Sequence, residues 1–143
     1  MLTAVHAPRR ADDGERGRHR LITTDVEAGK LGQDWLDYCA HSGLALDDIQ
    51  QGPWLQCTHY MLAFEMAKSG LGVALVPDFL ARRDVASGLL ARFDKTLLPS
   101  GRSYHLCYKQ SRGQERGIQD LVHWFKSQVE TAAGVNAARA STS

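Results

Sequence analysis

The sequence lacks any apolar run close to the ~20 residues that a helix needs to cross a bilayer. Its N-terminus is too polar for a secretory signal. Neither sign of charge predominates, because 17 Lys and Arg residues are balanced by 16 Asp and Glu. A near-neutral chain without a dense basic patch is not expected to bind DNA directly. We therefore expect a cytoplasmic protein with no membrane partner and no DNA contact of its own.

Cysteine is also scarce. The three cysteines are odd in number and widely spaced, which favours reduced, buried thiols over a disulfide framework or a redox pair. Cys57 with His59, and His105 with Cys107, could each place two metal ligands on one strand face. A structural zinc site normally needs four ligands, so no metal site is predicted.

The motifs of catalysis and cofactor binding are absent as well. There is no HExxH pair for zinc and no GxSxG turn to expose a serine nucleophile. Gly70 and Gly72 follow a helical pattern and precede a strand pattern, which reverses the order in a dinucleotide-binding fingerprint. We expect no catalytic residues, no cofactor and no enzymatic activity.

The most informative segment that is present covers residues 70–93. An apolar run, 73–76, lies between a glycine pair and Pro77, and such a run suits a strand covered on both faces, as in parallel α/β sheets. A short helix and, after Gly88, a second strand are predicted to follow. The length of 143 residues supports one domain with an ordinary core.

Further elements are predicted on both sides of this segment. Residues 2–6 and 20–23 read as short strands, separated by a charged, glycine-containing loop. Residues 32–42 show helical spacing, with Trp35 as a packing anchor and Gly43 as the C-terminal cap. Residues 44–51 form an acidic connection, and 53–57 are a strand candidate.

A helix is predicted from Thr58 to Ser69, with the Thr58 hydroxyl as N-cap. This helix is apolar around most of its circumference, which indicates burial on more than one side. The pattern fits a contact of Met61 and Phe64 with another subunit, and it fits the central helix of a compact domain equally well.

The C-terminal part is predicted to contain a strand over 103–108 and then an amphipathic helix. Ser111 and Gln114 have the spacing of a capping box at its start. The chain from 131 to 143, rich in Ala, Ser, Gly and Asn, is expected to be a disordered tail. One narrow apolar face of the helix, here called the α-terminal face, consists of Ile118, Leu121, Val122, Phe125 and Val129.

In this order and spacing, the elements resemble the effector-binding region of a LysR-type transcriptional regulator, and are most similar to the glycine-cleavage-activator-like subgroup. The resemblance covers roughly residues 1–130. The segments that carry it are LTAVHAP, RLITT, DWLDYCAHSGL, MLAFEMAKSGLGVALVP, SGLLARF, YHLCY and VHWFKSQVE.

The resemblance implies an α/β fold: the second lobe of a type 2 periplasmic-binding-protein-like effector domain, with crossing strands and a C-terminal helix. It assigns 1–8 to the first crossing strand, 20–102 to the second lobe and 103–130 to the return crossing strand and C-terminal helix. A winged helix-turn-helix and most of the first lobe are not matched, which implies a truncated chain. In the family the last helix packs on the first lobe, so the α-terminal face is expected to associate with a further copy, fold back on the second lobe, or belong to a fragment of a longer regulator.

The implied function is non-catalytic sensing of a small-molecule effector. The alternative is a protein-interaction module that dimerises with full-length LysR-type regulators. A homo-oligomer or such a regulator is the expected protein partner.

Candidate effector-binding residues follow from geometry and resemblance together. Ligands in open α/β sheets bind beyond the carboxyl ends of strands, where helix N-termini supply amides. The turn of Cys57, Thr58 and His59 is such a place and matches the effector-contacting segment of the family. Thr58 is the first candidate, and Thr23 with Thr24 the second. Capping or turn formation without a ligand would explain each of them as well.

Overall fold

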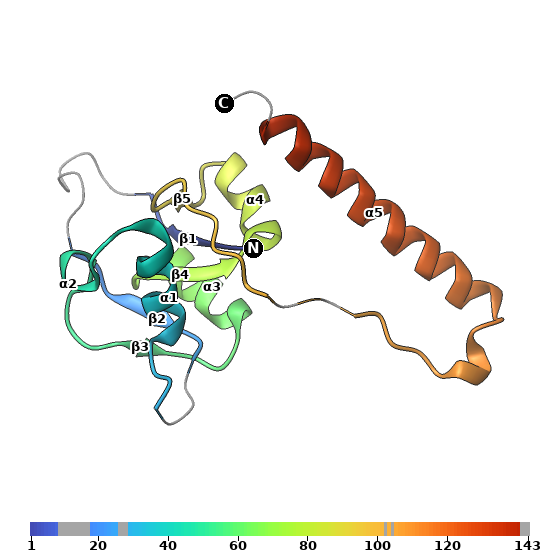
Figure 1. Ribbon diagram of the computed structural model, residues 1–143, viewed down its shortest axis with the longest axis horizontal. Helices are drawn as coiled ribbons and strands as arrows, with labels where there is room; N and C mark the ends of the chain where they lie inside the picture. Colours follow the sequence, from blue (N-terminus) through green and yellow to red (C-terminus); the bar gives the residue numbers. More distant parts are fainter. Residues whose placement is uncertain (9–17, 26–28, 102, 104, 141–143) are drawn as a thin grey trace. The chain divides into compact units, whose positions relative to one another are not determined.

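The computed structural model describes residues 1–8, 18–25, 29–101, 103 and 105–140, with side chains described as far as residue 130. The chain divides into two compact units, residues 1–101 and 102–143, and each is described by itself. The first unit contains the sheet and most of the helices, whereas the second contains the long C-terminal helix (Figure 1).

The first unit is built on one five-stranded sheet with the order β3-β2-β4-β1-β5. Strand β2 is parallel to both β3 and β4, whereas β1 runs antiparallel to β4 and β5, so the sheet is mixed. The predicted α/β class is confirmed. The strands are β1 (Leu2–His6), β2 (Leu21–Thr23), β3 (Leu55–Gln56), β4 (Val73–Pro77) and β5 (Ala91–Arg92).

Strand β4 is buried along its whole length, as the apolar run predicts, because helices cover both faces of the sheet. Neighbouring residues of a strand point to opposite faces. Val73 and Leu75 therefore belong to one core cluster, and Ala74 and Val76 to the other. The helices of this unit are α1 (Gln33–Ser42), α2 (Leu46–Ile49), α3 (Tyr60–Lys68) and α4 (Asp78–Ala86).

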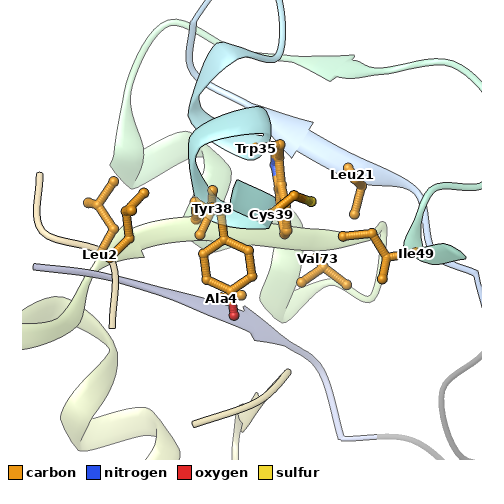
Figure 2. Close-up of a cluster of buried hydrophobic side chains, with 10 residues drawn as sticks. Leu2, Ala4, Leu21, Trp35, Tyr38, Cys39, Ile49 and Val73 are labelled. Carbon is orange, nitrogen blue, oxygen red and sulfur yellow. The ribbon is translucent and has the colours of Figure 1, made fainter. Parts of the chain in front are cut away.

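The first cluster lies beneath α1 and α2. Trp35 and Tyr38 are fully buried there, and their rings meet edge to face with centroids 5.5 Å apart. Figure 2 shows both side chains between α1 and the sheet, close to Leu21 and Val73. Trp35 is the packing anchor that the sequence predicts.

The second cluster joins the opposite face of the sheet to α3 and α4. Phe64 is buried in it, and its predicted contribution to an interface stays a prediction. Met61, predicted with it, is more than half exposed, at 55%. Met61 and Phe64 differ in exposure because residues three apart on a helix point in neighbouring but not identical directions.

Helix α1 ends as predicted. Gly43 has a φ of 75°, and its N–H donates to the Cys39 carbonyl at 2.9 Å. At the other end, Gly32 has a φ of 76°, and a Cβ added there would lie 2.5 Å from the Trp54 ring. Helix α2 lies within the segment predicted as an acidic connection, and it inserts Ile49 into the first core cluster.

Helix α3 begins one residue later than the proposed cap requires. His59 occupies the N-cap position and makes no side-chain capping bond, so the prediction that Thr58 caps the helix is wrong. The Thr58 hydroxyl lies 3.1 Å from His59 Nε2 instead. An N-cap needs extended backbone directly before the first helical residue, and here His59 supplies it.

The second unit differs from its prediction in three places. Residues 103 and 105–108 are not in a strand, because the described part of this unit offers no neighbouring strand for their backbone hydrogen bonds. Ser111 lies in the 3₁₀ helix η1 (Gln110–Arg112), ahead of α5 (Arg116–Ala140), so the capping box with Gln114 is not formed. Helix α5 continues to Ala140, through most of the predicted tail.

The cysteines are free thiols, as predicted. Cys39 and Cys57 are buried, but Cys107 is exposed, contrary to the expectation of burial.

Candidate functional site

The carboxyl ends of the parallel strands β2 and β3 lie side by side. Thr23 pairs with Gln56 across the two strands, and the Cys57 N–H donates to the Thr23 carbonyl at 3.1 Å. The Thr23–Thr24 segment and the turn of Cys57, Thr58 and His59 therefore meet at one edge of the sheet. This edge is the location that the topology argument favours for a ligand.

The two outermost side chains of this edge are Thr58 and His59, and both are exposed. Because neither side chain caps α3, their polar atoms can contact a ligand without uncapping a helix. The first turn of α3 follows directly, and the Leu62 and Ala63 N–H groups donate to the His59 carbonyl at 3.1 and 3.2 Å. The helix dipole adds partial positive charge at the same place.

Cys57 has a different character. Its thiol is buried and lies 3.7 Å from the Thr23 carbonyl oxygen. Burial raises the pKa of the Cys57 thiol, so the sulfur stays protonated and can donate to that carbonyl. Cys57 therefore supports the turn from within.

Thr23 is also internal. It is fully buried, its hydroxyl donates to Asp34 Oδ1 at 2.6 Å, and it accepts from the Asp25 N–H at 3.1 Å. Thr24 is only partly buried. Of the two threonines, Thr24 is the one that a ligand can reach without breaking these hydrogen bonds.

Asp34 is the residue that the sequence analysis did not select. Its carboxylate is 8% exposed and accepts from the Thr24 N–H at 3.1 Å and from the Trp35 N–H at 3.0 Å, in addition to Thr23. Burial raises the pKa of Asp34 and outweighs the hydrogen bonds from Thr23 and Thr24, which lower it. The available signal was an acid in the first turn of a helix that follows a strand ending in two threonines.

In the second unit, the α-terminal face is largely uncovered. Leu121 and Phe125 are each 43% exposed and Val129 is 66% exposed, whereas Ile118 and Val122 are half-buried. Trp124 adds a ring that meets Phe125 edge to face at 5.0 Å. A hollow of about 500 Å³ is lined by His105, Leu106, Phe125, Lys126, Val129 and Glu130.

Within the described residues, no three His, Cys, Asp or Glu side chains are grouped so as to hold a metal ion. In the same part of the chain, no helix is both long and apolar enough to cross a membrane.

Residues 3–130 match the family model described as LysR substrate binding domain. The chain belongs to this family. The resemblance stated from the sequence is thereby confirmed, and the LysR match spans both structural units.

Curated relatives carry the names of transcriptional regulators. The HTH-type transcriptional regulator TrpI of Pseudomonas aeruginosa is 41% identical over 59 residues, which are 41% of this chain and 19% of the relative. The glycine cleavage system transcriptional activator homolog of Haemophilus influenzae is 30% identical over 89 residues, which are 61% of this chain and 29% of the relative. This chain thus spans less than a third of the length of either regulator.

Solved structures agree on the fold. The effector domain of the transcriptional regulator AmpR of Pseudomonas aeruginosa superposes with a TM-score of 0.69 at 21% identity, over 95% of this chain and 63% of that one. The fold is therefore that of the LysR effector-binding domains, which is periplasmic-binding-protein-like, as predicted.

Proposed function

We propose that this chain is the non-catalytic, effector-sensing module of a cytoplasmic LysR-type regulator. In this proposal it binds a small molecule at the edge formed by Thr24, Thr58 and His59, and DNA is contacted by other parts of a longer regulator. The observation that carries the proposal is the convergence of these three residues from two separate segments, in a chain of the LysR family.

The chemistry of the edge suits a polar ligand group. The Thr58 hydroxyl can donate and accept hydrogen bonds, and the His59 ring offers one nitrogen of each kind when neutral. The positive end of the α3 dipole favours a negatively charged oxygen, such as that of a carboxylate. An amino acid or an aromatic carboxylic acid would satisfy these groups.

Replacing Thr58 by alanine is expected to weaken effector binding about tenfold, since one ligand hydrogen bond of about 1.4 kcal/mol is lost. The free energy of unfolding should change by less than about 0.5 kcal/mol, because Thr58 is exposed and caps nothing. The ligand is first identified by thermal-shift screening of amino acids and aromatic carboxylic acids, and its affinity is then measured by calorimetry.

Ser69→Ala is the matched control, since Ser69 is an exposed hydroxyl at the opposite end of α3. Equal affinities of Thr58→Ala and the unchanged protein would remove Thr58 from the site. A panel without any binder would count against sensing as the function.

A second function has its own observation in its favour. Apolar side chains are exposed on α3, at Met61 and Leu62, and along the α-terminal face. Each large apolar side chain that becomes buried on association contributes roughly 1.5–3 kcal/mol. A protein-interaction module that pairs with a further copy or with a full-length LysR-type regulator would use these surfaces.

Replacing Phe125 by aspartate is expected to abolish such assembly, because a charge in an apolar contact must be desolvated without a partner. Sedimentation velocity over a range of concentrations measures the result. His123→Asp places the same charge on an exposed position of α5 outside the α-terminal face, and it should leave the sedimentation coefficient unchanged. An unaltered profile for Phe125→Asp would exclude this face as the contact.

A further inference from the structure

The Asp34 carboxylate accepts hydrogen bonds from three protein donors. Oδ1 accepts from the Thr23 hydroxyl at 2.6 Å and from the Trp35 N–H at 3.0 Å. Oδ2 accepts from the Thr24 N–H at 3.1 Å. These donors belong to the end of β2 and to the start of α1, so one side chain connects the two elements.

Holding a carboxylate at this depth is costly. A buried charge gives up its hydration, and the loss is offset only by well-placed donors. Neutral hydrophobic packing could join β2 to α1 without that cost, and the same helix does so through Trp35 and Tyr38. We therefore infer that the carboxylate mainly fixes the conformation of the turn after β2, and contributes less to the packing of α1 on the sheet.

The influence of Asp34 extends to the second segment of the site. Thr23, held by Asp34 through its side chain, accepts the Cys57 N–H at 3.1 Å through its main-chain carbonyl. The Cys57 thiol points to the same carbonyl at 3.7 Å. Hydrogen bonds thus run from Asp34 through Thr23 to Cys57, and Cys57 directly precedes Thr58 in the chain.

The indole of Trp35 reinforces this series from the interior. Its Nε1–H donates to the Ile22 carbonyl at 2.9 Å, one residue before Thr23. Asp34 and Trp35 thus hold consecutive residues of β2, one through a side chain and one through the main chain.

We propose that Asp34 is the positioning residue of the candidate effector site, an inference that rests on the proposed function. It does not touch the effector. It fixes Thr24 directly, and through Thr23 and Cys57 it fixes Thr58, so that residues from both segments present their polar atoms in one arrangement. Asp34 is bonded to the turn, and the side chains offered to the ligand are hydroxyls and an imidazole.

The test uses amide hydrogen exchange of the full chain without any ligand. Asp34→Asn replaces one carboxylate oxygen by an NH₂ group, which then faces the Thr24 N–H or displaces the Thr23 and Trp35 donors. Exchange at the Thr24 and Cys57 amides should accelerate about tenfold, since each loses or weakens one hydrogen bond. Exchange at the Leu75 amide, in the central strand, should accelerate less. Asp37→Asn, on the exposed side of the same helix, is the control and should leave both amides unchanged.

A second pair of variants separates positioning from general support. Thr23→Ser keeps the hydroxyl that donates to Asp34, so the Cys57 amide should still exchange slowly. Thr23→Val keeps the shape of the side chain but removes the hydroxyl, so the Cys57 amide should exchange faster. The proposal would be overturned if Asp34→Asn accelerated exchange at the Thr24 and Trp35 amides but not at Cys57. It would also be overturned if the Cys57 amide exchanged at the same rate in both Thr23 variants. If Asp34→Asn does not fold, the comparison of the two Thr23 variants still tests the proposal.

Affinity supplies the final readout. For a ligand found in the carboxylic-acid and amino-acid panel, Asp34→Asn should weaken binding at least tenfold at a temperature where the variant is folded. Unchanged affinity would overturn the positioning role. A panel without binders would count against the proposed sensing function, while the exchange results would still decide whether Asp34 orders the two segments.

Discussion

Replacing Trp35 by alanine is expected to lower the free energy of unfolding by about 4 kcal/mol, among the largest effects of any single substitution in this chain. Trp35 is fully buried and contacts the edge of the Tyr38 ring. Its removal leaves a cavity between α1 and the sheet, and it also leaves the Ile22 carbonyl without the indole N–H. Both losses add to the cost.

Urea denaturation followed by circular dichroism measures this change. Leu36→Ala is the matched control, because Leu36 lies on the same helix and is 45% exposed. It should cost less than about 1 kcal/mol. Trp35→Phe separates the two losses, since it keeps much of the ring but no donor. A loss for Trp35→Ala no greater than that for Leu36→Ala would contradict the assignment of Trp35 as the anchor of the core.

Replacing Asp78 by alanine is expected to cost about 2–3 kcal/mol. Asp78 is almost buried at the start of α4, and it accepts from Arg82 Nε at 2.7 Å and from Arg92 Nη2 at 2.6 Å. The same Arg92 guanidinium donates through Nη1 to the buried Thr3 hydroxyl at 2.8 Å. Removal of the acid takes the carboxylate away from both guanidinium groups, and the cost is below that of a fully buried pair because both arginines keep some contact with water.

The Asp78 site also predicts a dependence of stability on pH. Burial alone would raise the pKa of Asp78, but hydrogen bonds from Arg82 and Arg92 and their charges outweigh burial and hold it below its usual range. The ionised acid therefore stabilises the fold fully above the unfolded-state pKa of about 3.9, and this contribution is lost as the pH falls through the lower folded-state pKa.

Thermal unfolding between neutral and acid pH tests this sign. In Asp78→Ala the acid-induced loss should be smaller than in the unchanged protein. Asp84→Ala provides the control, because Asp84 lies on the same helix and pairs with the partly exposed Lys68 at 3.2 Å. That pair should be worth less than about 1 kcal/mol. Parallel pH profiles for Asp78→Ala and the unchanged protein would contradict the role of the arginines.

Much of the fold could be predicted from local signals. The buried strand before Pro77 and the glycine cap at Gly43 each depend on residues close in sequence, and both are found as expected. The strand predicted at 103–108 and the cap at Thr58 are wrong for a shared reason. A strand needs a neighbour and a cap needs the helix to begin at one particular residue, and neither condition is visible in local composition.

For the candidate site, the sequence indicates which segments meet but not which side chains remain accessible. The carboxyl ends of β2 and β3 come together as the topology argument expects. Thr23 is the last residue of the fully buried strand β2 and is bonded to Asp34, whereas Thr24 follows the strand and is only partly buried. The place of Asp34 beside this turn depends on how α1 packs. The sequence alone does not distinguish a buried acid from an exposed one, because burial depends on where the helix packs.

The order of the strands has a consequence for biosynthesis. Leu2–His6 pairs with Val73–Pro77 and Ala91–Arg92, and Leu2 also forms a bridge with Leu98, so these partners all follow it in the chain. When β1 leaves the ribosome, the backbone N–H and C=O groups on both of its edges therefore lack their strand partners. They remain unpaired while most of the sheet-forming unit is translated. Such exposed edges invite association with other chains. During synthesis, the strand Leu2–His6 consequently depends on the arrival of residues 73–98 before its edges are protected from association with other chains.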